Sequence, residues 1–252
     1  MAQRDSLLCA FDALLEPGRF KDYGPNGLQV EGRAQVRRLV SGVTASLAFL
    51  QAAAEDGADA VFVHHGLFWR GQDGRVTGWM KQRLALLLAN DISLFAYHLP
   101  LDAHPELGNN ARFGLQLGLA ADGRFGEQDL GFIGRRVDGT AFADTRQLAQ
   151  HAELALGRRV TAVEGARGPI ERIAWCTGGA QGYFEAAIAA GADAFLTGEI
   201  SEPQTHYARE CAVTFIACGH HATERYGAPA VAARVASQLG IEHRFIDIDN
   251  PA

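Results

Sequence analysis

The sequence predicts an α/β protein made of two interlinked, similarly built lobes, each with a mostly parallel sheet flanked by helices. Apolar runs bounded by Gly and Asp alternate along the chain with helical patterns, which is typical of such sheets. Segments 39–66 and 173–200 each contain a strand, a small-residue loop, a helix, the letters GADA and a second strand, and a helix and third strand follow each. GADA is also a common link between a helix and a strand, but the matching element lengths favour an internal repeat over coincidence.

The elements can be assigned in order along the chain. The first helix begins at Asp5 or Ser6, and the acidic residues within it argue against a signal peptide. Ser201 and Gln204 fit a capping box at the start of a later helix. The predicted strands are 37–44, 58–64, 92–98, 131–137, 172–177, 192–197, 213–218 and 242–248. The predicted helices are 6–15, 46–56, 79–89, 110–118, 145–156, 181–190, 202–211 and 222–239. The predicted lobes are 1–125, completed by 226–252, and 126–225.

Bulk composition excludes several classes of function. The 252 residues are 48% hydrophobic and 21% charged, as in an ordinary soluble globular protein. The net charge of −6 gives no general attraction to nucleic acid or anionic membranes, although a local basic patch remains possible. The chain contains no apolar run long enough to predict a membrane span. Four separate cysteines without a secretion signal predict free thiols and a cytoplasmic protein.

Metal-binding residue types follow the predicted strands at their carboxyl ends, where open parallel sheets bind their ligands. Six of the nine histidines lie in these segments. In strand order, the residues are His64 and His65; His98, Asp102 and His104; Glu199 and Glu202; and His220, His221 and Glu224. Core packing alone does not explain such clustering.

The mixture of imidazole and carboxylate groups favours Zn, Fe, Mn or Co, and the lack of a cysteine cluster argues against a structural zinc knot. His64 and His65 are adjacent, so in extended backbone they point opposite ways, which suits two metals with one histidine each. His220 and Glu224 are four residues apart and can reach one ion from a helix turn. Asp102 could bridge the two ions. These five residues therefore predict a two-metal site whose open positions hold water or hydroxide.

Each residue type also has a structural interpretation. Tandem histidines can be hydrogen-bonded strand ends, and Asp102 can be a turn or cap residue. His98 and His104 fit supporting roles around the metals better than direct ligation. His206, four residues after Glu202, can face the site or the helix surface. The prediction of a metal site depends on all the clusters lying at the carboxyl ends of predicted strands.

Two loops carry weaker signals. Thr177-Gly178-Gly179 follows a strand and opens a helix, so its N–H groups could hold an anion, or the residues could form only a tight turn. The loop at 23–29 is rich in turn-forming residues and either borders the pocket or forms a surface turn.

Five motifs of this chain resemble the Nif-three-like family, whose members are commonly called GTP cyclohydrolase I type 2 homologues. The motifs are DYGPNGLQVEG at 22–32, GADAVFVHHGLFW at 57–69, YHLPLDAHPELGNN at 97–110, TGEISE at 197–202 and GHHATERYG at 219–227. They span nearly the whole chain in order, and the sequence is similar to the bacterial short form of the family.

The resemblance implies two linked α/β lobes, a ring-shaped homohexamer and a metal site between the lobes that faces an internal cavity. It places the ligands of two metals on His64, His65 and Asp102 of the first lobe and on His220 and Glu224 of the second. Pro229 departs from the family pattern, and a proline inside a helix removes a backbone hydrogen bond. We therefore expect the last long helix to bend or restart just beyond the ligand Glu224.

The residues predict a dinuclear metal-dependent hydrolase, and the resemblance implies that it acts on a nucleotide or a related heterocycle. Two divalent ions per chain, among Zn, Fe, Mn, Co and Mg, would activate a water molecule. Glu199, Glu202 or His98 would move protons. In a cyclohydrolase reaction, hydroxide would attack the imidazole carbon of guanine. The same ligands fit a metal-dependent phosphoesterase, and a non-catalytic metal-binding regulatory or interaction protein is the other alternative.

Overall fold

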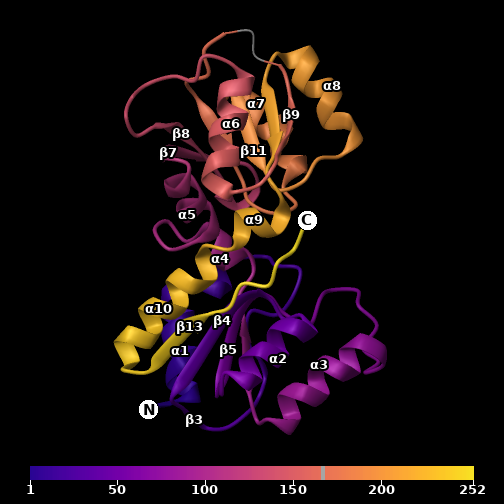
Figure 1. The fold of residues 1–252 in the computed structure, drawn as a ribbon, viewed down its shortest axis with the longest axis vertical. Coiled ribbons are helices and arrows are strands. Elements are labelled where there is room, and N and C mark those ends of the chain that lie inside the picture. The colour runs from indigo at the N-terminus through magenta and orange to yellow at the C-terminus, as the bar shows by residue number, and fades with distance from the viewer. Residues whose placement is uncertain (166–167) are drawn as a thin grey trace. The chain divides into compact units, whose positions relative to one another are not determined.

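The computed structural model describes residues 1–165 and 168–252, which form two compact units (Figure 1). Unit 1 comprises Met1–Gly108 and Arg225–Asp249, and unit 2 comprises Asn109–Glu224 and Asn250–Ala252. The first boundary lies at Gly108, earlier than the expected 125. The reason is that α5 (Asn109–Gln116) and β7 (Leu119–Phe125) pack on and pair with β8 (Gly131–Arg136), a strand of unit 2.

Unit 1 is built around a five-stranded sheet in the order β13-β4-β5-β6-β2. The strands are β2 (Gly27–Val30), β4 (Arg38–Thr44), β5 (Ala60–His65), β6 (Ser93–Ala96) and β13 (Glu242–Phe245). Four of them are parallel, and β2 pairs with β6 in the antiparallel direction. The two-residue strands β1 (Ala2–Gln3) and β3 (Gln35–Val36) form a separate antiparallel pair. The C-terminal strand therefore completes the sheet of unit 1.

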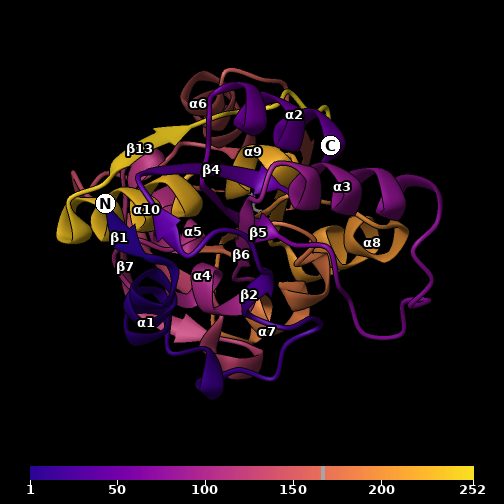
Figure 2. The ribbon, with the colours of Figure 1, turned by 90° about the horizontal axis from the view of Figure 1, so that it is seen from below.

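Helices cover both faces of this sheet. Figures 1 and 2 show α1 (Arg4–Leu15) and α10 (Gly227–Leu239) on one face, and α2 (Leu47–Glu55) and α3 (Gly78–Ala89) on the other. Strand side chains alternate between two apolar clusters, as the pleat requires. Phe62 packs with α1 and α10, whereas its neighbour Val61 packs with α2 and α3. The short helix α4 (Leu99–Ala103) follows β6, and a single 3-10 turn, η1 (Pro17–Arg19), follows α1.

Unit 2 contains a six-stranded sheet in the order β7-β8-β10-β11-β12-β9. The remaining strands are β9 (Thr161–Val163), β10 (Ile173–Trp175), β11 (Ala194–Thr197) and β12 (Thr214–Ala217). The helices are α5, α6 (Thr145–Leu156), α7 (Phe184–Ala189), α8 (Glu202–Cys211) and α9 (His220–Glu224), with 3-10 turns η2 (Glu127–Asp129) and η3 (Gln181–Tyr183). β10, β11 and β12 are parallel, whereas β7, β8 and β9 pair in the antiparallel direction. The expected parallel strands thus form only the central part of the sheet, which is mixed as a whole.

The core of unit 2 is rich in aromatic side chains. Phe184 of α7 stacks on Phe195 of β11 with ring centroids 5.8 Å apart and meets Phe215 of β12 at 4.9 Å. On the other face, the fully buried Trp175 contacts α5 at Gly114, where an added Cβ would lie 2.6 Å from the indole ring. These contacts hold the strands whose carboxyl ends carry the candidate ligands.

The two GADA links of the internal repeat make the same hydrogen bonds. The Asp59 carboxylate accepts backbone N–H groups of 37–38 at 2.8 and 3.1 Å, and Asp193 accepts those of 171–172 at 3.0 and 2.8 Å. Burial raises the pKa of Asp59, but these bonds and the Arg33 guanidinium outweigh it and lower the pKa. Each Asp thus ties the start of its second strand to the start of the first, which gives the repeated letters a physical role.

The last long helix is divided near its start. The sequence predicts one helix at 222–239, but α9 ends at Glu224 and α10 begins at Gly227. Pro229 is the third residue of α10, where the first turn of a helix has no partner for its N–H groups. The proline thus allows the helix to restart, as its position suggested. Among the described residues, no helix has both the length and the apolar character needed to cross a bilayer.

Candidate metal-binding residues in the two units

His64 combines complete burial with a fixed ring orientation. It lies near the end of β5, and its Nδ1–H donates to the Tyr97 carbonyl oxygen at 3.1 Å. In the neutral ring, Nε2 then carries the lone pair that a metal needs. This nitrogen lies 3.5 Å from Oδ1 of Asp102, a buried residue of α4. A divalent cation fits an imidazole nitrogen and a carboxylate oxygen held together in this way.

His65 joins His64 on one side of the strand end. The two ring centroids are 4.5 Å apart, and one ring nitrogen of each lies within 4.8 Å of one from His98. The expectation that the two rings point opposite ways is therefore wrong, since both rings lie close together and close to His98 at the end of β5. His65 Nδ1 is hydrogen-bonded to Thr44 Oγ1 at 3.0 Å, which orients the ring.

His98 is held by the loop that precedes β2. Its Nδ1 lies 2.7 Å from Oδ1 of the buried Asp22, and its backbone N–H donates to Asn26 Oδ1 at 2.7 Å. The other Asp22 oxygen accepts the Asn26 amide and the Leu99 N–H, both at 2.9 Å. Burial raises the pKa of Asp22, but His98, Asn26 and Leu99 lower it to about 2. The turn-rich loop thus borders the histidine cluster, and its residue Asp22 was missed from the sequence.

In unit 2, His220 lies between two carboxylates. Its Nε2 is 3.0 Å from Glu224 Oε2, and its Nδ1 is 2.6 Å from Glu199 Oε1. Burial lowers the pKa of His220, but hydrogen bonds and charge from Glu224 and Glu199 outweigh it and raise the pKa to about 9. The ring therefore holds a proton at Nε2, and a metal cation could take the place of that proton. Glu199 is hydrogen-bonded to the other ring nitrogen, Nδ1.

The turn at Thr177-Gly178-Gly179 supports this pair. The N–H groups of Thr177 and Gly178 donate to Asn110 Oδ1 at 2.8 Å and to Thr223 Oγ1 at 3.0 Å. Because both groups have protein acceptors, the anion-binding interpretation of this turn is wrong for them. Gly178 has a φ of +71°, and an added Cβ would overlap the Glu224 carboxylate. The turn therefore needs glycine to leave room for the candidate ligand.

Other residues considered from the sequence lie in local contacts. Glu202 begins α8 with its side chain 80% exposed, and it pairs with His206 at 2.8 Å. His206 therefore takes the helix-surface position that the sequence left open. His104 Nδ1 accepts the N–H groups of Glu106 and Leu107 and stabilises a turn. The contact that Glu202 makes is with His206 on the helix surface, which weakens its expected role as a proton shuttle.

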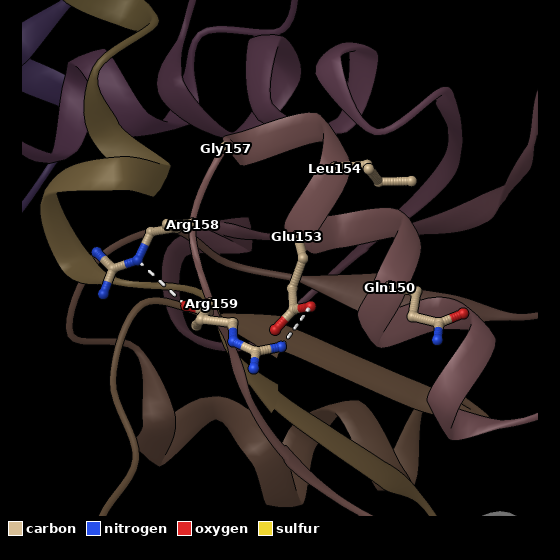
Figure 3. Close-up of a pocket in the computed structure, with 6 residues that line it drawn as sticks. All are labelled: Gln150, Glu153, Leu154, Gly157, Arg158 and Arg159. Carbon is tan, nitrogen blue, oxygen red and sulfur yellow. Dashed lines mark hydrogen bonds and ion pairs between the residues drawn. The ribbon is translucent and has the colours of Figure 1, made fainter.

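A shallow open hollow of unit 2 lies at the C-terminal end of α6 (Figure 3). Its lining residues are Gln150, Glu153, Leu154, Gly157, Arg158 and Arg159. Arg159 pairs with Glu153 at 3.7 Å, and Arg158 donates to the backbone oxygen atoms of Pro251 and Ala252 at 2.9 and 3.2 Å. The lining contains none of the candidate metal ligands, although its Arg158 guanidinium lies against Gly219, the residue before His220.

Glu199→Ala should weaken metal binding about 10- to 100-fold, because carboxylates that orient a ligating histidine have effects of this size. Glu199→Gln keeps an acceptor for the His220 Nδ1–H and should weaken binding less. Competition titration against a chromophoric chelator at pH 7 measures both affinities. Glu202→Gln is the matched control, since Glu202 contacts His206 on the helix surface. Equal affinities for wild type and Glu199→Ala would show that Glu199 does not position His220.

Known proteins show where this chain belongs. The family described as Duf34/NIF3 (NGG1p interacting factor 3) matches residues 2–251. The chain is 54% identical over 244 residues to the GTP cyclohydrolase 1 type 2 homolog of Pseudomonas aeruginosa, covering 96% of this chain and 95% of the relative. It is 46% identical over 241 residues to the relative of the same name from Escherichia coli (strain K12), covering 94% and 95%.

Two solved structures have the same fold over their whole length. The protein ybgI, whose function is given as unknown, has a TM-score of 0.95 and 43% identity, with 100% of both chains covered. TTHA1606 from Thermus thermophilus has a TM-score of 0.90 and 32% identity, again with 100% of both chains covered. The match of the family over nearly every residue and these relatives lead to one conclusion: the chain belongs to the Duf34/NIF3 family.

Proposed function

We propose that this protein is a metal-dependent hydrolase whose dinuclear centre uses ligands from both units. The ligands are His64, His65 and Asp102 of unit 1 and His220 and Glu224 of unit 2. The substrate class is a nucleotide or a related heterocycle. The curated relatives named GTP cyclohydrolase 1 type 2 homolog support this class, since they cover nearly the whole chain.

One repeated arrangement carries the proposal. In unit 1, His64 Nε2 lies 3.5 Å from a buried carboxylate, while its Nδ1 is fixed by a carbonyl oxygen. In unit 2, His220 Nε2 lies 3.0 Å from Glu224, while its Nδ1 is fixed by Glu199. Ligating histidines commonly donate their other ring N–H to an oxygen, which sets the tautomer and strengthens the ligand. Each unit thus places an imidazole nitrogen next to a carboxylate oxygen, and such a pair can bind a divalent cation.

Bound divalent ions would lower the pKa of a water molecule and stabilise negative charge on the attacked group. The protein's own groups would then handle protons. His98 is the proposed shuttle, because Asp22 orients its ring through Nδ1 and one of its ring nitrogens lies within 4.8 Å of those of His64 and His65. Glu199 is better suited to hold His220 than to transfer a proton, since its oxygen already bonds to that ring.

Assembly is a further part of the proposal. The family resemblance supports a ring-shaped homohexamer, and the mass of the protein in solution tests it. The same donor set could also serve phosphoester hydrolysis or a non-catalytic metal-binding regulatory protein, and the experiment below separates these cases.

Asp102→Ala should greatly weaken metal binding and abolish turnover. Wild-type protein should hold close to two metal ions per chain and hydrolyse GTP in the presence of Mn, Fe, Zn or Mg. Metal analysis and product detection by chromatography measure the two properties. Asp73→Ala is the control, because Asp73 is an exposed loop residue paired with Arg75. Both properties should remain in that variant.

The other outcomes have distinct meanings. Turnover of simple phosphoesters without action on GTP would indicate a phosphoesterase. Full metal occupancy without turnover of any of these substrates would favour the non-catalytic alternative. Metal retained after all five ligands are changed to Ala would overturn the site itself.

A further inference from the structure

Two partly exposed aromatic side chains adjoin His98 in unit 1. Tyr23 is 60% exposed, and its ring lies 6.0 Å from the His98 ring at an interplanar angle of 67°. The Trp69 ring lies 5.0 Å from His98 at 88° and 6.1 Å from His65. Both aromatic rings therefore stand beside the histidine cluster to which the hydrolase proposal assigns metal binding and proton transfer.

The backbone around these rings is firmly held. The Arg70 N–H donates to the Tyr23 carbonyl oxygen at 2.6 Å, and its guanidinium donates to the Asp22 carbonyl oxygen at 2.6 Å. An added Cβ at Gly24 would lie 3.4 Å from the Trp69 ring, so the two loops are in close contact. Because the backbone that carries the two rings is held before any ligand arrives, less conformational entropy is lost on binding.

Core packing does not account for the exposure of Tyr23. By contrast, Phe11, Phe62 and Tyr97 are fully buried and form one cluster in the core of unit 1. Exposed aromatic rings next to reactive groups are typical of sites that bind planar ligands, because every fused heterocycle offers a flat face for stacking. A simple phosphate has no such face and gains nothing from these rings.

We propose that Tyr23 and Trp69 form the surface that binds the planar heterocycle of the substrate, next to the histidines of unit 1. This inference rests on the proposed function in one respect, namely that the substrate is processed at these histidines. It narrows the proposed substrate class: purines and related fused-ring compounds are preferred to simple phosphoesters, because the rings recognise the base rather than the phosphate.

The test measures binding instead of turnover. Isothermal titration of the metal-loaded full-length protein compares guanosine, GTP and inorganic triphosphate as probes. Trp69→Leu and Tyr23→Ala should each weaken the binding of guanosine and GTP about tenfold, the usual effect of losing one stacking ring. Affinity for triphosphate and the metal content should not change. Trp69→Phe retains an aromatic face and should restore most of the affinity.

Trp79→Leu is the matched control. Trp79 is 52% exposed on α3, and its ring lies 4.7 Å from the Arg83 guanidinium. Unchanged guanosine affinity in both Trp69→Leu and Tyr23→Ala would overturn the inference, as would wild-type protein that binds triphosphate but no guanosine. Stacking-dependent binding without hydrolysis would sink the hydrolase proposal and leave the binding surface in place, so the two failures are distinguishable.

Discussion

Gly178→Ala should remove most of the metal affinity that unit 2 contributes while the chain still folds. Its added Cβ would overlap Glu224 Oε1 and lie 2.9 Å from Cδ of that side chain and 3.2 Å from His220 Nε2. A carboxylate at the end of a flexible side chain can swing aside, so the clash moves the ligand instead of the backbone. We expect metal affinity to fall at least tenfold, which corresponds to about 1.4 kcal/mol of lost binding free energy.

The same substitution should lower the free energy of unfolding modestly, so that the chain still folds. Gly178 has a φ of +71°, and an L-residue in the left-handed region costs about 1–2 kcal/mol. Metal analysis of the purified variant measures occupancy, and urea unfolding of the metal-free protein measures the free energy of unfolding. Gly179→Ala is the matched control, since its Cβ would be 3.6 Å from both Glu199 Oε1 and His220 Cε1, an ordinary contact. Equal metal occupancy in the two variants would contradict the role assigned to Gly178.

The sequence predicted the parts of this protein that depend on local patterns. The capping box is present, with the Gln204 side chain accepting the Ser201 N–H at 3.1 Å. The central strands of both sheets were found because they are continuous apolar runs. β7 was missed because only its end residues Leu119 and Phe125 are buried, and the polar residues between them show no strand periodicity. The strands β2 and β9 were also missed, because neither is a continuous buried run: the two middle residues of β2 are half-buried and no residue of β9 is buried.

The candidate site was predictable in its residue types but not in its contacts. Histidines and acids placed after buried strands indicated the chemistry, since parallel strands end at one edge of a sheet. The pairing of Asp22 with His98 joins residues 76 positions apart, and it depends on how a turn-rich loop folds onto β6. No local pattern distinguishes Asp22 from an ordinary turn aspartate.

The same limit applies to Glu199. Its position after β11 suggested a proton shuttle, but its role as partner of His220 depends on the turn between β12 and α9. Likewise, the alternation rule did not predict that the His64 and His65 rings lie 4.5 Å apart at the end of β5. Sequence patterns therefore predict the location of a site more reliably than the role of each residue within it.

Asp102→Ala and Glu224→Ala should weaken metal binding in a non-additive manner. The proposed centre takes Asp102 from unit 1 and Glu224 from unit 2 for the same pair of ions. Once one carboxylate is lost, the remaining carboxylate contributes less to metal binding. The double variant should therefore bind metal only slightly more weakly than the weaker of the two single variants. The expected coupling free energy is about 1–3 kcal/mol, the range found for residues that share a partner.

Competition titrations of wild type, both single variants and the double variant complete this thermodynamic cycle. Asp102→Ala combined with Glu202→Ala is the control pair, because Glu202 contacts His206 on the surface of α8 and its change should add nothing. Independent sites in the two units would give effects that add to within about 0.5 kcal/mol. Additivity of that kind, together with two ions per wild-type chain, would mean that each unit holds its own ion, and a mechanism with both ions acting on one water molecule would have to be abandoned.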